Sequence, residues 1–410
     1  MGRMLILVVM GLIVVFGVIQ LGVINRIDLA MGRTIEYHER MQGKNIANSL
    51  LERAVNEVED DLGWRDGLQE PDFLSGAGEV LVDDFTTDTT LGPYQLLLTG
   101  TGVVGGSTTE VEVIMERTSF ARYSYFTNIE GSIYFITGDT VQGPLHTNDH
   151  IDIAGSPDFF GPVTSTQMWQ GTGTPQFHST TNFSSDSIHL PVNMTDLTNA
   201  ANSGGLRFND YIKVQLRADG TADISQWVSG GWWSSGYWDT PVTYNLSDYN
   251  GVISSSYDVY VEGTLDGQLS IHSEDDIIVY GDVMYETDPE TDPTSDDMLG
   301  LIGEDDVIVE ENAHQASGSQ DLRIDASIMA AGGSFTVEDY GSGSPRGRLY
   351  VTGGVIQNAR GPVGTFSNTW SGPVLQSGFQ KSYSYDTRFL TRWPPYFPVQ
   401  DKYDIISWRE

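Results

Sequence analysis

Hydrophobic residues are concentrated at the start of the chain and form only short runs afterwards. Residues 4–24 contain one polar residue, Gln20, and no charged residue. About 20 consecutive apolar residues are enough for a helix to span a bilayer. A cleaved secretory signal would have a shorter apolar core followed by a small-residue cleavage site. The pattern therefore predicts a long hydrophobic helix over residues 4–24, and we expect it to be retained.

The helical pattern continues beyond this segment. Apolar residues recur at i, i+1, i+4 and i+5, a spacing that forms a stripe on one face of a helix. They are Ile46, Ala47, Leu50, Leu51, Ala54, Val55 and Val58. The first proline is Pro71, and Gly63 is placed as a C-terminal stop. We therefore expect one helix over residues 1–62, with Ile46, Leu50, Leu51, Val55 and Val58 packed against a β-sheet.

Alternation of apolar and polar residues begins after the helix. Residues 93–117 alternate on both sides of Gly105-Gly106-Ser107, which is the pattern of a β-hairpin. The hairpin is expected to cover the apolar stripe of the helix. A small antiparallel β unit over residues 63–125 follows from this.

Residues 126–410 contain short apolar runs that are followed by Gly or Asn. Examples are Val259-Tyr260-Val261, Ile277-Ile278-Val279 and Val307-Ile308-Val309. Their intervals are near one or two coils of about 20 residues, which favours a parallel β-helix, or β-solenoid; a β-sandwich is the alternative. The predicted fold class is thus mainly β with one long N-terminal α-helix, a small antiparallel β unit and a β-solenoid ectodomain.

Residues 165–255 interrupt the repeat and are rich in Ser, Thr, Gly and Trp. We interpret this stretch as an insertion. Exposed aromatic rings can stack on sugar rings or on a neighbouring subunit, whereas packing in a core is the alternative. The candidate contact residues are Trp227, Trp232, Trp233 and Trp238.

Composition excludes several classes of partner and chemistry. The chain has 21 Lys and Arg residues against 56 Asp and Glu, a formal charge of -35. Binding to DNA or RNA depends on basic residues that displace counterions, so nucleic acid is not an expected partner. The chain has no cysteine, which excludes disulfides and thiolate metal sites.

The acidic stretch over residues 286–297 offers hard oxygen ligands, which suit calcium. The candidate ligands are Asp288, Asp292, Asp296 and Asp297, and the groups Asp275-Asp276 and Glu304-Asp305-Asp306 offer the same chemistry. A solvated acidic loop is the alternative, because the EF-hand spacing is missing. No other cofactor is expected.

Catalysis is not expected. Enzymes that cleave acidic polysaccharides do use β-helices, which directs attention to Arg323, Arg346, Arg348 and Arg360. Surface ion pairs explain these arginines equally well. The chain has no Gly-x-Ser-x-Gly elbow, no HExxH and no phosphate-binding loop, so we predict no catalytic residues.

The N-terminal pattern resembles that of type IV pilins and minor pilins over about the first 120 residues. Pilins usually carry a Glu at the fifth mature position, where this chain has Leu5. The resemblance implies a helix surface in a filament core or membrane, comprising Leu5, Val9, Leu12, Phe16, Gly17, Leu21 and Ile24.

A second resemblance covers about residues 125–410. The stretches Phe135-Ile136-Thr137-Gly138-Asp139 and Gly361-Pro362-Val363-Gly364 are similar to an uncharacterised domain of environmental bacterial surface proteins. The similarity implies an architecture and no chemistry.

The sequence therefore predicts a structural subunit of an extracellular, pilus-like filament at the cell surface. Its helices would form a homo-oligomeric core after a stage in the inner membrane, and its β-rich domains would lie outside. The alternative is a membrane-anchored surface or periplasmic protein that binds glycans or mediates adhesion.

Overall fold

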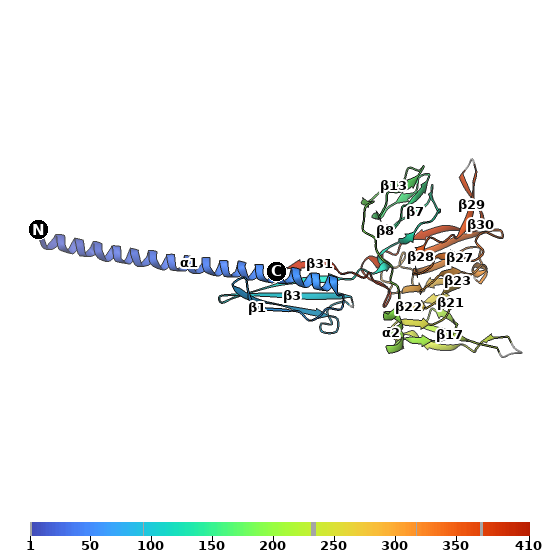
Figure 1. Cartoon of the computed structure of the whole chain (residues 1–410), viewed down its shortest axis with the longest axis horizontal. Helices are drawn as coiled ribbons and strands as arrows, with labels where there is room; N and C mark the ends of the chain where they lie inside the picture. Colours follow the sequence, from blue (N-terminus) through green and yellow to red (C-terminus); the bar gives the residue numbers. More distant parts are fainter. Residues whose placement is uncertain (1, 93, 231–234, 317, 370–371) are drawn as a thin grey trace. The chain divides into compact units, whose positions relative to one another are not determined.

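The computed structural model describes residues 2–92, 94–230, 235–316, 318–369 and 372–410. The chain divides into two compact units, one of Met1–Thr118 with Asp401–Glu410 and one of Ser119–Gln400. The prediction of a mainly β chain with one long N-terminal helix is confirmed (Figure 1).

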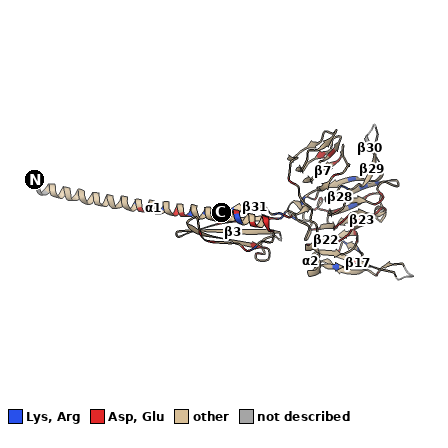
Figure 2. Ribbon diagram, viewed as in Figure 1, with Lys and Arg blue, Asp and Glu red and all other residues tan. Residues whose placement is uncertain are grey.

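The first unit begins with helix α1, which runs without interruption from Gly2 to Asp60. At 1.5 Å per residue it is about 90 Å long. Residues 4–25 of this helix carry no charge (Figure 2). The helix ends just before Gly63, since the Asp61 carboxylate accepts the Gly63 N–H at 2.9 Å and the chain turns there.

The C-terminal part of α1 packs on one antiparallel sheet. Its strands follow in the spatial order β1 (Leu68–Phe73), β2 (Gly76–Asp84), β3 (Gln95–Val104), β4 (Ser107–Glu116) and β31 (Asp404–Arg409). Strands β3 and β4 form a hairpin that turns at Gly105 and Gly106, where the sequence predicts it. The helix stripe and the inward residues of β3 and β4 form one buried hydrophobic cluster.

The last strand of this sheet comes from the far end of the chain. Strand β31 pairs with β4, from Asp404↔Glu116 to Arg409↔Glu112. The sequence pattern places residues 401–410 in the ectodomain, whereas the structure places them in the first unit. A pairing between segments almost 300 residues apart leaves no local pattern in the sequence.

The backbones of helix and sheet are in close contact at two glycines. A Cβ added at Gly102 on β3 would collide with the carbonyl oxygen of Gly43 on α1, and one added at Gly43 would lie 3.0 Å from the Gly102 carbonyl oxygen. The absence of side chains at both positions brings the two backbones together, and this contact sets the depth at which the helix stripe is buried.

The second unit contains two runs of parallel strands. The first run covers residues 125–182 and forms three ladders. They comprise β5 (Tyr125–Ile129), β8 (Leu145–Thr147), β11 (Val163–Ser165) and β14 (Thr181–Asn182); then β6 (Phe135–Ile136), β9 (Asp152–Ala154) and β12 (Gln170–Gly171); and β7 (Thr140–Val141), β10 (Asp158–Phe159) and β13 (Gln176–Phe177).

The second run forms two longer ladders, again with parallel pairing. The first ladder comprises β15 (Leu206–Phe208), β20 (Val252–Ser255), β22 (Gln268–Ser273), β24 (Met298–Gly303), β26 (Leu322–Ala330) and β28 (Pro345–Ala359). The second comprises β16 (Ile212–Arg217), β21 (Val259–Leu265), β23 (Ile277–Tyr285), β25 (Val307–Val309) and β27 (Phe335–Val337). Their inward residues form the largest buried cluster of the chain's described part.

The two runs meet at β28. Its first part, to Thr352, pairs with β30 (Gly372–Ser384), and its second part, from Val355, pairs with β5. Strand β29 (Gly364–Thr369) lies antiparallel to β30. Short helices α2 (Thr195–Ser203) and α3 (Ala313–Ala316) and the 3₁₀ turns Phe120–Arg122, Leu246–Asp248 and Thr387–Leu390 connect these strands.

The stretch over residues 165–255 is only partly separate from the repeat. Strands β15 and β16 lie within it and pair in parallel with β20 and β21. Strands β17 (Thr221–Val228), β18 (Tyr237–Trp238) and β19 (Val242–Asn245) depart from it, because they pair in antiparallel fashion. Polar loops of different length between the strands hide the period from a sequence scan.

The glycine contact between helix and sheet gives the first prediction. Gly102→Ala should lower the free energy of unfolding of the first unit by about 1–3 kcal/mol, because the added methyl overpacks the interface. A Cβ at Gly106 meets no atom within 4 Å, so Gly106→Ala is the matched control. Hydrogen exchange of the β3 and β4 amides measures the stability of the first unit in both variants. Equal protection in the two variants would contradict the prediction.

Candidate functional site

The hydrophobic part of α1 has no partner within the described chain. The α1 segment is the one described helix that is long and apolar enough to cross a membrane, and its most apolar window is 0% buried. All the predicted core residues with side chains are exposed: Leu5, Val9, Leu12, Phe16, Leu21 and Ile24. A Cβ added at Gly17 would meet nothing within 4 Å. This surface is therefore free for contact with lipid or other helices.

The residues predicted to pack between helix and sheet lie in the first unit's core. Ile46, Leu51 and Val58 are fully buried, and Leu50 and Val55 are nearly so. They contact inward residues of β3 and β4, including Leu96, Leu98, Val111, Val113 and Met115. The two parts of α1 thus differ sharply in environment.

Two of the four tryptophans that the sequence suggests as contact residues lie together. The rings of Trp227 and Trp238 pair across β17 and β18 with centroids 5.3 Å apart. Lys213 Nζ lies 5.0 Å from the Trp238 ring centroid. These three residues, with Tyr211 and Tyr260, line a small cavity of about 270 Å³. Trp232 and Trp233 lie outside the described residues.

The four predicted calcium ligands are not brought together in the described part of the chain. Asp288 pairs with Arg323 at 2.9 Å, and this hydrogen bond holds the pKa of the Asp288 carboxyl below its usual value. The buried Asp297 carboxylate accepts the N–H groups of Gly267 and Thr287. Asp292 and Asp296 are exposed. Hydrogen bonds and one ion pair therefore account for this loop.

The other acidic pairs do converge. Two groups have carboxylate oxygens within 4.8 Å of one another, namely Asp258, Asp275 and Asp276, and Asp276, Asp305 and Asp306. Parallel register brings them together, because Val259, Ile277 and Val307 occupy matching positions on β21, β23 and β25. Burial and neighbouring carboxylates raise the pKa of Asp276 to about 6.

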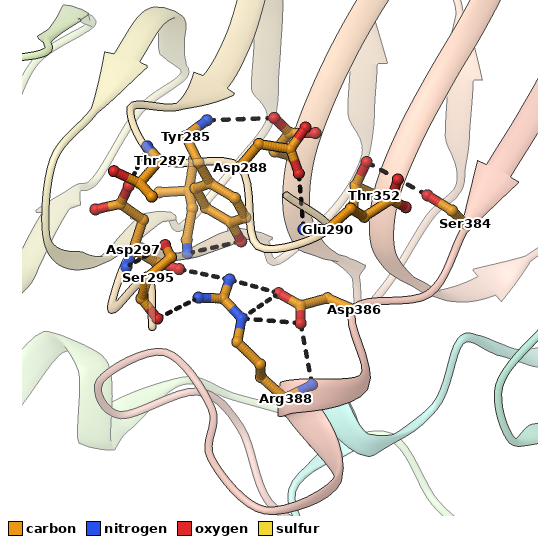
Figure 3. Close-up of polar contacts among 12 residues, drawn as sticks. Tyr285, Thr287, Asp288, Glu290, Ser295, Asp297, Thr352, Ser384, Asp386 and Arg388 are labelled. Atoms are coloured by element: carbon orange, nitrogen blue, oxygen red, sulfur yellow. Dashed lines mark hydrogen bonds and ion pairs between the residues drawn. The ribbon is translucent and has the colours of Figure 1, made fainter. Parts of the chain in front are cut away.

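A polar network fixes the acidic loop on the second unit (Figure 3). The Arg388 guanidinium donates to the carbonyl oxygens of Ser295 and Asp297 at 2.9 and 2.7 Å, and also to the Asp386 carboxylate. Arg388 also lies over the Tyr285 ring, 5.4 Å from its centroid. Because the Asp386 carboxylate is buried, the pair neutralises a charge that water does not reach.

A cavity of about 740 Å³ lies beside this network, where β28 and β30 meet the first run. Arg323 and Arg348 line it from β26 and β28, Lys381 lines it from β30, and Arg360 lies just after β28. Arg323, Arg348 and Arg360 are among the arginines to which the sequence directs attention, whereas Lys381 is not. No local signal could have found Lys381, because only the pairing of β28 with β30 carries it to the cavity.

Comparison with known proteins adds two findings. A family model described as "Domain of unknown function (DUF4900)" matches residues 94–182, fewer than half of the chain, from the β3–β4 hairpin to the end of β14. A solved structure described as "Crystal structure of competence-associated pilin ComZ from Thermus thermophilus" is 9% identical and covers 90% of this chain and 97% of that chain, with a TM-score of 0.30. No curated protein matches the chain.

The pKa of Asp276 predicts a pH-dependent stability. A carboxyl whose pKa is raised on folding favours the native state at low pH, and this contribution is lost as pH rises from about 4 through 6. Asp276→Asn keeps an oxygen for the Asp306 N–H and removes the charge. At pH 7.5 the Asp276→Asn variant should therefore be more stable than the parent by about 1 kcal/mol, a value that allows for solvent screening. At pH 4 the two proteins should differ little in stability.

Thermal unfolding at the two pH values measures this difference. Asp296→Asn, at an exposed position of the acidic loop, is the matched control and should show no such pH dependence. A gap between Asp276→Asn and the parent that is the same at pH 4 and pH 7.5 would refute the assignment.

The Arg388 network predicts that the acidic loop depends on one side chain. Arg388→Met leaves the buried Asp386 carboxylate unpaired, which costs about 3–5 kcal/mol, and frees the segment around Ser295. Limited proteolysis with mass spectrometry should show faster cleavage within residues 286–297. Arg392→Met, at an exposed position, is the control. Equal cleavage rates in the two variants would show that Arg388 does not hold the acidic loop in place.

Proposed function

We propose that this protein is a structural subunit of an extracellular, pilus-like filament whose core is a bundle of N-terminal helices. The observation that supports this most strongly is an exposed apolar row on α1 beyond the bilayer-length segment. Ile27, Met31 and Ile35 are each more than half exposed, and their i, i+4, i+8 spacing places them on one helix face.

A plain membrane anchor accounts for residues 4–24 but not for this row. The charged residues Asp28 and Arg33 lie between its members and Arg26 lies directly before it, and charges are costly in the bilayer core. The row is therefore expected to lie in water unless another helix covers it. Burial of apolar surface is worth about 25 cal/mol per Å², so packing against copies of the same helix would be favourable.

Before assembly, the uncharged segment over residues 4–25 would hold the subunit in the inner membrane. In the filament, the same residues would exchange lipid for neighbouring helices, where close packing favours small residues such as Gly11, Gly17 and Gly22. The β-rich units would then lie outside this core. Partners of the subunit are accordingly copies of itself.

For the second unit we infer a β-solenoid. Tyr125, Leu145, Val163 and Thr181 occupy one position of successive parallel strands, about 18–20 residues apart. Val259, Ile277 and Val307 also occupy one position of successive parallel strands in the second run, at intervals of 18 and 30 residues. Stacked coils of this kind bury a continuous core and leave faces and loops for contact with the surroundings.

The alternative function is that of a membrane-anchored surface or periplasmic protein that binds glycans. The aromatic cavity of Trp227, Trp238, Tyr211 and Tyr260 favours it, because aromatic rings stack on sugars. In this alternative, α1 is an anchor and a stalk, and no ordered assembly of helices occurs.

A substitution outside the bilayer-length segment separates the two functions. Ile35→Asp should abolish filaments while leaving membrane insertion intact, because a carboxylate would be buried without a partner in the helix bundle. Leu21→Asp and Gly17→Leu should also abolish filaments. Val192→Asp, at a position 96% exposed in the second unit, is the matched control.

Electron microscopy of material sheared from cells, with mass spectrometry of the subunit, measures the outcome. Regular filaments from the parent and from Val192→Asp, but not from Ile35→Asp, would support the proposal. Detergent-dependent monomers from the parent, or filaments from Ile35→Asp, would contradict it.

A further inference from the structure

Cations gather at one cavity of a strongly acidic chain. Arg323, Arg348, Arg360 and Lys381 all line the 740 Å³ cavity of the second unit, although the chain has only 21 Lys and Arg residues. Its volume lies within the range of about 300–1,000 Å³ that is usual for ligand pockets. The lining also holds the carboxylates of Asp139, Asp288 and Glu290, so the role of the cations depends on which of them these and other carboxylates neutralise.

Internal ion pairs explain two of these cations. Arg323 donates to Asp288 and Asp325 at 2.9 Å each. Arg360 pairs with the buried Glu130 at 3.1 Å and lies 4.0 Å from the Phe135 ring centroid. Both arginines hold parts of the second unit together.

The other two cations have no such partner. Among the residues that the structure describes, the Arg348 guanidinium and the Lys381 ammonium form neither a hydrogen bond nor an ion pair. Burial and repulsion by Arg360 lower the pKa of Lys381 to about 8, while Asp139 and Glu130 act on it only through longer-range attraction. A desolvated ammonium without a partner costs free energy, which a bound anion would recover.

The remaining lining describes the rest of the ligand. Tyr350 presents a ring that is 38% exposed, and Ser382 and Gln380 offer hydroxyl and amide groups. Asp139 and Glu290 supply carboxylates that can accept from hydroxyl groups. Rings, hydroxyls and acceptors next to free cations fit a polyhydroxylated molecule that also carries negative charge.

We propose that this cavity binds a short stretch of a carboxylate-bearing polysaccharide, with Arg348 and Lys381 paired to uronate carboxylates and a sugar ring against Tyr350. The site is separate from the tryptophan cavity and from the exposed helix surface. The proposal therefore applies whether the protein is a filament subunit or a membrane-anchored monomer.

Calorimetric titration of the full chain in detergent with trigalacturonate tests this proposal. Binding is expected at pH 7, with affinity falling about tenfold or more by pH 9.5 as Lys381 loses its proton. Lys381→Met and Arg348→Gln should each weaken binding about tenfold. Lys381→Met should also remove the decline in affinity between pH 7 and 9.5. Lys402→Met, on the surface of the first unit, is the matched control and should bind as the parent does.

Further probes define the ligand class. The neutral galactose trimer should not bind measurably, and inorganic sulfate or phosphate should not displace trigalacturonate at equal concentration. Any of three results would overturn the proposal: no heat of binding at millimolar trigalacturonate, equal affinity of the neutral trimer, or displacement by the simple anions. Unchanged affinity in both Lys381→Met and Arg348→Gln, with unfolding temperatures near the parent's, would also overturn it.

Discussion

The packing of one half of a continuous helix on a small sheet determines what the other half must do. Helix α1 is covered by β3 and β4 only where its stripe from Ile46 to Val58 faces them. The backbone approach of Gly43 and Gly102 fixes this contact, and no second sheet covers residues 4–24 in the described chain. A helix that is apolar on every face cannot be stable in water. The first unit therefore requires lipid or other helices around its N-terminal part.

A second constraint operates in the parallel ladders, where residues at equal positions stack on one another. The rule is favourable for Val259, Ile277 and Val307, which build the core. The same stacking is unfavourable just before these positions, where Asp276 converges with Asp258 and Asp275 in one group and with Asp305 and Asp306 in another. Burial raises the pKa of Asp276, and repulsion from the stacked carboxylates adds to this effect. In a repeating fold, a favourable or unfavourable residue type at one position therefore contacts the same residue type in the next strand, and its effect on stability is repeated.

How much the sequence could predict depends on the range of the interactions. The long helix and the β3–β4 hairpin follow from local periodicity and from Gly105, so their prediction needed no partner. The pairing of β31 with β4 and the junction of β28 with β5 join distant segments. The calcium prediction at Asp288, Asp292, Asp296 and Asp297 relied on proximity in sequence. The register of the strands instead brings Asp258, Asp275 and Asp276 together. Amino-acid composition does not reveal strand register.

The position of the large cavity follows from the same topology. Strand β28 pairs with β30 up to Thr352 and with β5 from Val355 onward, so Gly353 and Gly354 lie where its partner changes. A Cβ at Gly354 would collide with the Tyr123 carbonyl oxygen, so the first run can approach only because this position lacks a side chain. The second part of β28 continues the parallel ladder from β26 into β5 and β8, whereas its first part pairs with β30. Tyr125 and Lys381 line the space where these two partners diverge. In a regular stack every inward position is filled by its neighbours, whereas a junction leaves polar groups such as Lys381 without a partner. Ligand chemistry is therefore expected at this interruption of the repeat rather than within the repeat itself.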